Sequence, residues 1–447
     1  MTLSFPAWKE GQVVSTRHEL AIVKGATRHP ILPASPELTW TIRPAEKQAN
    51  ISHQKYSPDG KRLFLAGYPS GIVQFWDLEN RKEIRRMESH KGYRGSSDYA
   101  HLTPDWKTLY MGEETRKVTQ IEDQGKNVRF FENTGKVLVW DAETGEQKSS
   151  LYPASGYGAG YCQMSPDGRK LVLVEMKSYK PSEVGKTTLA QTSVWDLKTQ
   201  ERRLLGDAYM VPNFSSDSRF GYFSITNYDK KTSIIKKIDL DTGKTLAEVD
   251  CGEQDRHLSL QGVSPDDRWL AVKLAGKLAA PPTTLFLDTA DLKEKGRLVL
   301  APDPKTYGWQ AGSYSPDGKI FETSDGLGNI HLWSLEEKKV IRVIPMENAS
   351  GVRSFSPDGR YLAIAWMPKY DESLDDAREP EPADMPQPRI SLIDLKDAAK
   401  TPFVLVAPHG YCGSLAFRPD GKQLAFGSWG AVHIFDIEKL IKKKEMP

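Results

Sequence analysis

The sequence predicts an all-β protein built from eight repeated four-stranded units. A tight-turn sequence, first met as Ser57-Pro58-Asp59-Gly60, returns in seven further copies, with 41 to 62 residues between successive turn aspartates. Between the copies lie short apolar runs rich in β-branched and aromatic residues, which are typical of strands. This recurrence indicates repeated supersecondary units within one architecture rather than independent domains.

The repeated sequence has the residues that a tight turn needs. Proline presets the backbone of the second position, the Asp side chain can bond its own backbone, and glycine accepts a positive φ. The copy Ser215-Ser216-Asp217-Ser218 lacks both proline and glycine and is the weakest. The other copies begin at Thr103, Ser165, Ser264, Ser315, Ser356 and Arg418.

Four strands are expected in each unit. One strand precedes the turn, and a second follows it, as at residues 63–66. A third run ends in an aromatic or aliphatic residue and usually an Asp, and a fourth follows, as at residues 340–344. The tryptophans that end four of the third strands are expected to be buried between neighbouring units. They are Trp76, Trp140, Trp195 and Trp333.

These repeats resemble the WD40 family of β-propellers, in the degenerate form with Ser-Pro-Asp-Gly turns that is common in bacterial members. The resemblance covers residues 36 to 438 and implies an eight-bladed β-propeller of four-stranded antiparallel blades. The family's buried Asp-His-Ser/Thr-Trp network is approximated only around Ser324, Asp325 and Trp333, with no histidine at the matching upstream position. Apolar packing between blades is therefore expected to hold the ring together.

Closure of the ring requires an outer strand for the last blade. Only the Lys-rich residues 438–444 follow the last third strand, and they are a poor strand. Residues 38–42, just before the first unit, are expected to complete that blade, which leaves no open sheet edge at the seam. Residues 1–35 then form an N-terminal arm and residues 439–447 a basic C-terminal tail. The alternative is seven blades and a separate hairpin, because the copy at Ser215 is weak.

Composition limits the classes of function. The formal net charge is +2, so no overall field favours nucleic acid or a membrane surface. The N-terminus lacks the basic start and apolar run of a signal peptide, and no stretch reaches the ~18 apolar residues of a membrane span. Three cysteines form no CxxC pair, which favours a reducing cytoplasm.

Three units carry extra residues between their second and third strands. These are units two, three and seven, and in propellers such loops share a face with the connections between blades. The unit-two insertion, residues 113–133, ends in an apolar run and is expected to form an extended hairpin. The unit-seven insertion, residues 367–386, is Pro-rich and acidic and is interpreted as a solvated loop that could order against a basic partner. Surplus loops on one face usually mark the working face.

Tyrosines flanked by glycine recur just upstream of inner strands, at the expected mouth of the central channel. Such residues offer amphipathic contact area on backbone that a partner can approach closely. The alternative is that they pack over the blade edges as structural residues of the repeat. The predicted partner-binding residues are Tyr93, Arg94, Tyr157, Tyr307, Trp309 and Tyr411.

Signals for catalysis are weak. The sequence has no His/Cys cluster at metal-ligand spacing and no G-x-S-x-G nucleophile elbow. A channel-mouth site could use His90 or His409 with Asp98, although chance proximity is the simpler explanation. The sequence therefore favours a non-catalytic scaffold for a protein or peptide partner, without a cofactor, as a possible subunit of a larger complex. The alternative is an enzyme or small-molecule binder that uses the channel.

Overall fold

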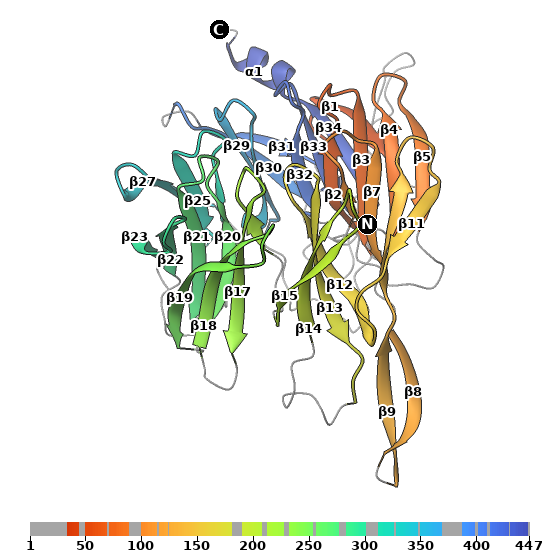
Figure 1. Ribbon diagram of the computed structural model, residues 1–447. Helices are drawn as coiled ribbons and strands as arrows, with labels where there is room; N and C mark the ends of the chain where they lie inside the picture. The colour runs from red at the N-terminus through yellow and green to blue at the C-terminus, as the bar shows by residue number, and fades with distance from the viewer. Residues whose placement is uncertain are drawn as a thin grey trace, which may run out of the picture.

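Eight four-stranded antiparallel sheets form the molecule (Figure 1). The computed structural model describes residues 34–43, 50–68, 71–88, 100–113, 116–123, 125–180, 190–207, 212–227, 232–253, 256–276, 283–300, 312–325, 328–346, 349–368, 387–397, 401–408, 412–428 and 430–445. In seven sheets the chain runs from the inner strand to the outer one in sequence order. The blades are numbered here in chain order.

The strands are given by blade, from inner to outer. Blade 1 is β2 (Asn50–Tyr56), β3 (Arg62–Tyr68), β4 (Ile72–Asp77) and β5 (Lys82–Glu88); blade 2 is β6 (Ala100–Leu102), β7 (Thr108–Glu113), β10 (Lys136–Asp141) and β11 (Gln147–Leu151). Blade 3 is β12 (Tyr157–Met164), β13 (Lys170–Lys177), β14 (Ala190–Asp196) and β15 (Arg202–Gly206); blade 4 is β16 (Asn213–Phe214), β17 (Phe220–Asn227), β18 (Thr232–Asp239) and β19 (Thr245–Glu253). Blade 5 is β20 (Arg256–Val263), β21 (Trp269–Gly276), β22 (Thr283–Asp288) and β23 (Glu294–Val299); blade 6 is β24 (Gly312–Tyr314), β25 (Ile320–Ser324), β26 (Ile330–Ser334) and β27 (Lys339–Ile344). Blade 7 is β28 (Ala349–Phe355), β29 (Tyr361–Trp366), β30 (Arg389–Asp394) and β31 (Phe403–Val406); blade 8 is β32 (Ser414–Phe417), β33 (Gln423–Ser428), β34 (Ala431–Asp436) and β1 (Leu38–Ile42).

The eighth blade is closed by the N-terminal strand, as the sequence predicts. Strand β1 pairs antiparallel with β34, from Leu38 opposite Phe435 to Ile42 opposite Val432. The Thr41 hydroxyl lies 3.1 Å from Nδ1 of the buried His433, which adds a side-chain bond across the seam. The eight-blade prediction is confirmed, and the seven-blade alternative is wrong.

Apolar packing joins each blade to the next. The described residues form eight buried clusters, and each contains residues of two consecutive blades. One of them packs Ile51 and Leu63 of blade 1 against Ala425 and Val432 of blade 8, so the ring is continuous across the seam. Burial of such side chains contributes about 1.5–3 kcal/mol each, and the ring therefore draws its stability from every interface between blades.

The tryptophans are buried to different degrees. Trp195 and Trp333 are buried as predicted, whereas Trp76 and Trp140 are partly buried and pack against clusters between blades. The indole N–H groups of Trp76, Trp140 and Trp195 are buried without an acceptor among the described residues. These blades therefore lack the hydrogen-bonded tryptophan of the WD40 network, in agreement with the sequence.

The repeated turns adopt one geometry. The Ser57 hydroxyl donates to Asp59 at 2.5 Å and accepts from the Arg62 N–H at 2.8 Å. The bond from the Ser57 hydroxyl to Asp59 helps lower the pKa of the Asp59 carboxyl. The weakest copy makes the corresponding bond, in which the Ser215 hydroxyl donates to Asp217 at 2.6 Å. The fourth turn residue has a positive φ in every copy, including three without glycine, namely Trp106, Ser218 and Asp267.

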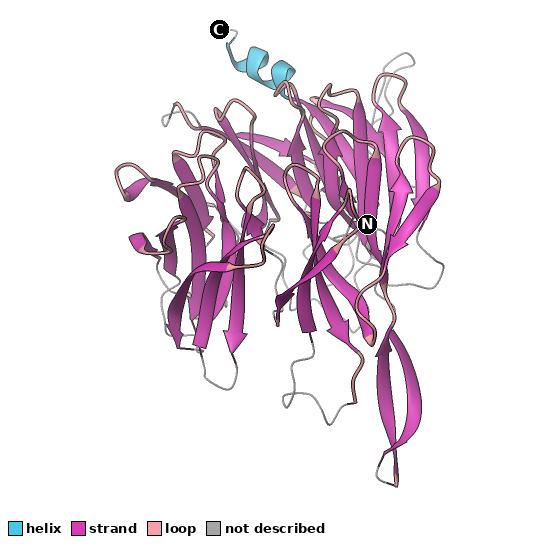
Figure 2. Cartoon of the chain, viewed as in Figure 1, coloured by secondary structure: helices cyan, strands magenta, loops and turns pink. Residues whose placement is uncertain are grey.

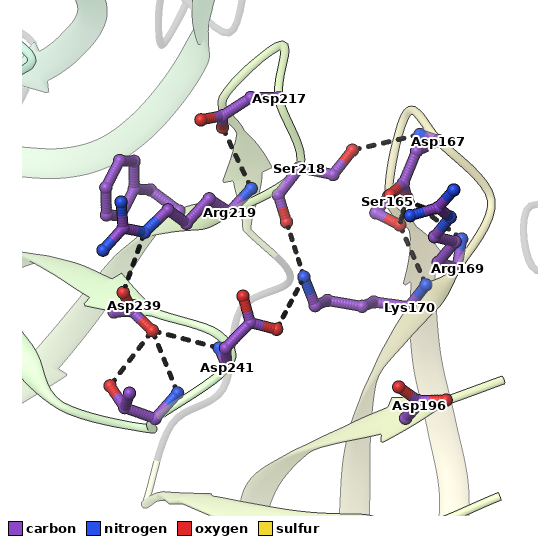
Figure 3. A network of polar contacts seen from close by, with 12 residues as sticks. Ser165, Asp167, Arg169, Lys170, Asp196, Asp217, Ser218, Arg219, Asp239 and Asp241 are labelled. Carbon is purple, nitrogen blue, oxygen red and sulfur yellow. Dashed lines mark hydrogen bonds and ion pairs between the residues drawn. The ribbon is translucent and has the colours of Figure 1, made fainter. Parts of the chain in front are cut away.

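The non-glycine turn residues contact the preceding blade. The Ser218 hydroxyl of blade 4 accepts from the Asp167 N–H of blade 3 at 3.0 Å, and Lys170 binds both the Ser218 carbonyl and Asp241 (Figure 3). The Asp267 carboxylate of blade 5 similarly accepts from a backbone N–H of blade 4 at 2.8 Å. A positive φ strains a residue with a side chain, and these contacts between blades offset that strain.

A helix follows the last blade strand. Helix α1 (Ile437–Glu445) is the only helix among the described residues (Figure 2). Ile437 and Leu440 are buried in the cluster between blades 7 and 8, so this part of the predicted basic tail packs on the propeller. Within the described part of the chain, no helix has the length and apolarity needed to cross a membrane.

Candidate functional site

The blades present two different faces. In an antiparallel blade, the loop between the second and third strands lies at the same end as the connection to the next blade. The repeated turns lie at the opposite end. We call the first end the insertion face, because the insertions of units two, three and seven belong to it.

The unit-two insertion forms a hairpin on this face, as predicted. Strands β8 (Arg116–Asp123) and β9 (Lys126–Asn133) pair along their full length, with Asp123 opposite Lys126 at the tip. Gly125 in the tight turn has φ +74°, a conformation that favours glycine. Figure 1 shows the hairpin projecting well beyond the ends of the neighbouring blade strands.

Blade 3 anchors the base of the hairpin. The Phe131 N–H donates to the Tyr179 carbonyl and the Tyr179 N–H donates back to the Phe131 carbonyl, both at 2.9 Å, and the two rings stack at 5.1 Å. Nearby, the Asn133 side-chain amide donates to the Lys177 carbonyl at 2.8 Å. These bonds fix the direction in which the hairpin leaves the propeller. The sequence predicted the hairpin but missed the anchor, because nothing local to Tyr179 indicates a partner so distant in sequence.

Of the six predicted partner-binding residues, the structure describes only Tyr157. Tyr93, Arg94, Tyr307, Trp309 and Tyr411 lie outside the described residues, as do His90, Asp98 and His409 of the alternative channel-mouth site. Tyr157 is the first residue of β12 and is half-buried. It belongs to the inner strand itself rather than to the connection before it.

The glycines beside Tyr157 have backbone roles. Gly156 has φ +81°. A Cβ on Gly158 would lie 2.7 Å from the carbonyl carbon of Asn133, the last residue of β9, so only glycine lets β12 pass this close to the base of the hairpin. The next residue, Ala159, donates its N–H to the Gly135 carbonyl at 2.8 Å. In this copy the Gly-Tyr-Gly pattern therefore serves the packing of two blades, and the recognition role of Tyr157 stays a prediction.

A buried cluster of charges joins blades 5, 6 and 7. The Arg353 guanidinium of β28 lies 2.8 Å from a Glu322 carboxylate oxygen of β25 and donates to the Ser324 hydroxyl at 2.5 Å. The Glu322 carboxylate also accepts from the Ser313 hydroxyl at 2.8 Å. The side chains of Arg353 and Glu322 are only 3% and 2% exposed.

Lys273 of β21 is the third charge of this cluster. It is 3% exposed, and burial lowers its pKa to about 8, with Arg353 acting in the same direction and Glu322 opposing it. The cluster thus holds two basic groups and one acid. The sequence missed it because the three residues belong to different repeats, and nothing in their spacing indicates that they meet.

Two histidines have structural partners. His331 of the third strand of blade 6 lies 2.9 Å from the Asp325 carboxylate. The sequence has no histidine at the upstream position of the WD40 network, and His331 binds this aspartate instead. His101 of β6 lies 2.8 Å from the Cys162 carbonyl of blade 3, and burial lowers its pKa to about 4 although this bond opposes the shift. A neutral His101 with its proton on Nε2 donates that bond. Among the described residues, no group of three or more His, Cys, Asp or Glu side chains is arranged to hold a metal ion.

Solved structures resemble this fold, whereas no family model and no curated protein match the chain. The crystal structure of the C-terminal WD40 domain of Sif2 matches 89% of this chain and 99% of its own length, with a TM-score of 0.55 and 12% identity. The hydrazine synthase of Kuenenia stuttgartiensis matches 88% of this chain and 96% of its own, with a TM-score of 0.47 and 15% identity. The eight antiparallel blades and the likeness to the Sif2 domain show that the chain has the fold of a WD40-type β-propeller.

Proposed function

We propose that the protein is a non-catalytic scaffold that binds a protein or peptide partner through the insertion face. The observation that carries this proposal is the β8–β9 hairpin. It is anchored to the propeller by the Phe131–Tyr179 contacts, yet its strands project beyond the blades. An element fixed at its base presents its residues to a partner at a low cost in conformational entropy.

The hairpin offers apolar contact area. Val118 is 53% exposed, and Ile121, Val128 and Phe130 are partly exposed on a two-stranded sheet. Exposed apolar side chains framed by charges are typical of recognition surfaces. We propose that this surface and the tyrosines at the channel mouth contact one partner, which makes the protein a subunit of a larger complex.

We further propose a cytoplasmic location. None of the three cysteines is in a disulfide, and Cys162 and Cys412 are buried. Burial raises the pKa of the Cys162 thiol to about 12, which leaves it unreactive. Buried thiols kept reduced fit a reducing compartment.

Two variants test the proposed binding face. The first replaces Tyr93, Tyr157 and Tyr411 by Ala, and the second replaces residues 116–133 by a short Gly-Ser bridge. Each variant is compared with wild type by affinity purification from the native source and by thermal melting. We expect both to stay folded and to lose a stoichiometric partner, because aromatic anchors commonly contribute 2 kcal/mol or more at an interface.

The same preparations separate scaffold from enzyme. An absorption spectrum and elemental analysis of purified wild type should show neither cofactor nor metal. A bound chromophore or metal would favour the alternative, a small-molecule or catalytic site in the channel. A partner recovered equally well by wild type and both stable variants would exclude the insertion face as the binding surface.

A further inference from the structure

The hairpin has two outer edges, and the edge of β9 is bound to the propeller at its base through Phe131 and Asn133. On β9, the N–H and carbonyl of Phe131 bind Tyr179 and therefore point away from β8. The opposed pair Val118 and Phe131 is consequently a non-hydrogen-bonded pair of the ladder. The backbone groups of Val118 thus point away from β9 as well. By alternation along the strand, the same holds for Arg116, Gln120 and Glu122.

Strand β8 therefore presents an edge of eight residues, and its only described partner is β9. An edge of this length is a template for pairing with another strand, and proteins usually blunt such edges or use them. Lys117, Val118, Gln120 and Glu122 of this edge are exposed, and Thr119 and Ile121 between them are partly buried.

The charges of β8 are divided between its two ends. The strand reads Arg-Lys-Val-Thr-Gln-Ile-Glu-Asp, so two basic residues begin it, uncharged residues fill the middle, and two acidic residues end it. Such a strand is complementary to itself when two copies run antiparallel, because each basic end then lies beside an acidic end. Opposite charges across a strand pair stabilise it, and like charges destabilise it. An unrelated strand of uniform charge would match only one end.

We propose that two copies of this chain associate through β8, which pairs antiparallel with β8 of the second copy to give one sheet of four strands. The register that uses all outward-pointing residues places Arg116 opposite Glu122 and Val118 opposite Gln120 of the other copy. Thr119 then lies on the two-fold axis, and Lys117 is diagonal to Asp123. A two-fold axis makes the contact isologous, so it closes after two copies.

The geometry of the hairpin permits this pairing. Because β9 is held on its other edge by blade 3, the β8 edge faces away from that anchor, and the hairpin extends clear of the blades (Figure 1). A single strand pair is far smaller than the ~1,600 Å² of a standard interface. The dimer is therefore weak, and it forms with increasing concentration rather than as an obligate assembly.

A charge exchange tests the proposal on the full chain. One variant carries Arg116→Glu and Lys117→Glu, which makes both ends of β8 acidic. The other carries Glu122→Lys and Asp123→Lys, which makes both ends basic. Sedimentation velocity over a concentration series measures each variant alone, their equimolar mixture and wild type, and circular dichroism confirms that each is folded.

We expect wild type to dimerise with concentration, each variant alone to stay monomeric, and the mixture to form a heterodimer. Val118→Pro should also abolish the dimer, because it removes an outward-pointing N–H that β9 does not use. Wild type that stays monomeric at its highest soluble concentration would overturn the proposal. So would variants that dimerise alone as wild type does.

Discussion

Replacing Glu322 by Gln should be among the most damaging single changes in the protein. The substitution keeps the shape of the side chain but removes the one negative charge that the described residues place in the cluster with Arg353 and Lys273. Two buried positive charges would remain together. Removing one partner of a buried ion pair costs about 3–5 kcal/mol, against a total stability of roughly 5–15 kcal/mol for a native protein.

The companion variant Arg353→Met should cost less. It leaves Lys273 beside Glu322, which is a neutral pair. The order of the two effects follows from the composition of the cluster, since loss of the acid leaves a net charge of +2 and loss of Arg353 leaves none. Urea unfolding at pH 7, followed by tryptophan fluorescence, measures both free energies.

The Glu322 variant should also recover as the pH rises. The pKa of Lys273 is about 8 in the folded protein, against an ordinary lysine value of 10.5, so the unfolded chain binds more protons between these values. Stability contributed by this group therefore increases with pH across that window. Without Glu322 the pKa falls further, and the increase begins at lower pH. A Glu322→Gln protein within 1 kcal/mol of wild type at pH 7, with an unchanged pH profile, would refute the reasoning.

Three other perturbations have defined outcomes. Trp195→Ala should lower the free energy of unfolding by about 3–5 kcal/mol, because the ring is buried between blades 2 and 3; an unchanged thermal melt would contradict this. Replacing residues 371–384 by a short Gly-Ser bridge should leave the melting temperature almost unaltered, because a Pro-rich acidic segment contributes little packing, and loss of soluble protein would count against it. His101 should contribute a loss of at most about 3 kcal/mol to the wild-type stability as the pH falls from 6.5 to 4, since the unfolded chain takes up a proton on this residue that the folded state excludes. His101→Gln should remove this part of the pH profile, measured by urea unfolding at each pH.

The sequence predicted the architecture because the determinants of each blade are local. Three features can be recognised in the sequence without knowing which residues contact one another. They are the turn from Ser57 to Gly60 with its copies, the alternation of short strands, and the position of residues 38–42. Eight copies of the turn predicted eight blades, and the missing outer strand of the last blade predicted that residues 38–42 close the ring. Even the weak copy at Ser215 folds as the others do, because Ser218 has a neighbouring blade to bind.

The buried charge cluster between blades 5, 6 and 7 could not be predicted in the same way. A repeat pattern reports what the units share, whereas Lys273, Glu322 and Arg353 are each peculiar to one unit and meet only when three blades are assembled. The partner of Asp325 escaped prediction for a different reason. The family pattern places a histidine upstream of the blade, whereas Asp325 binds His331 within blade 6.

The glycines around Tyr157 show why a repeated motif alone does not decide function. The pattern suggested a recognition ring, yet Gly158 is required by the close approach of Asn133, whatever Tyr157 binds. A residue can be repeated because the blades pack alike, so the repetition by itself does not assign a partner to Tyr157. The charge order of β8 is different in kind, because it occurs in a single insertion and not in the repeat. A unique feature on a projecting strand is therefore the stronger indication of an interaction, and the charge exchange between two β8 variants tests it directly.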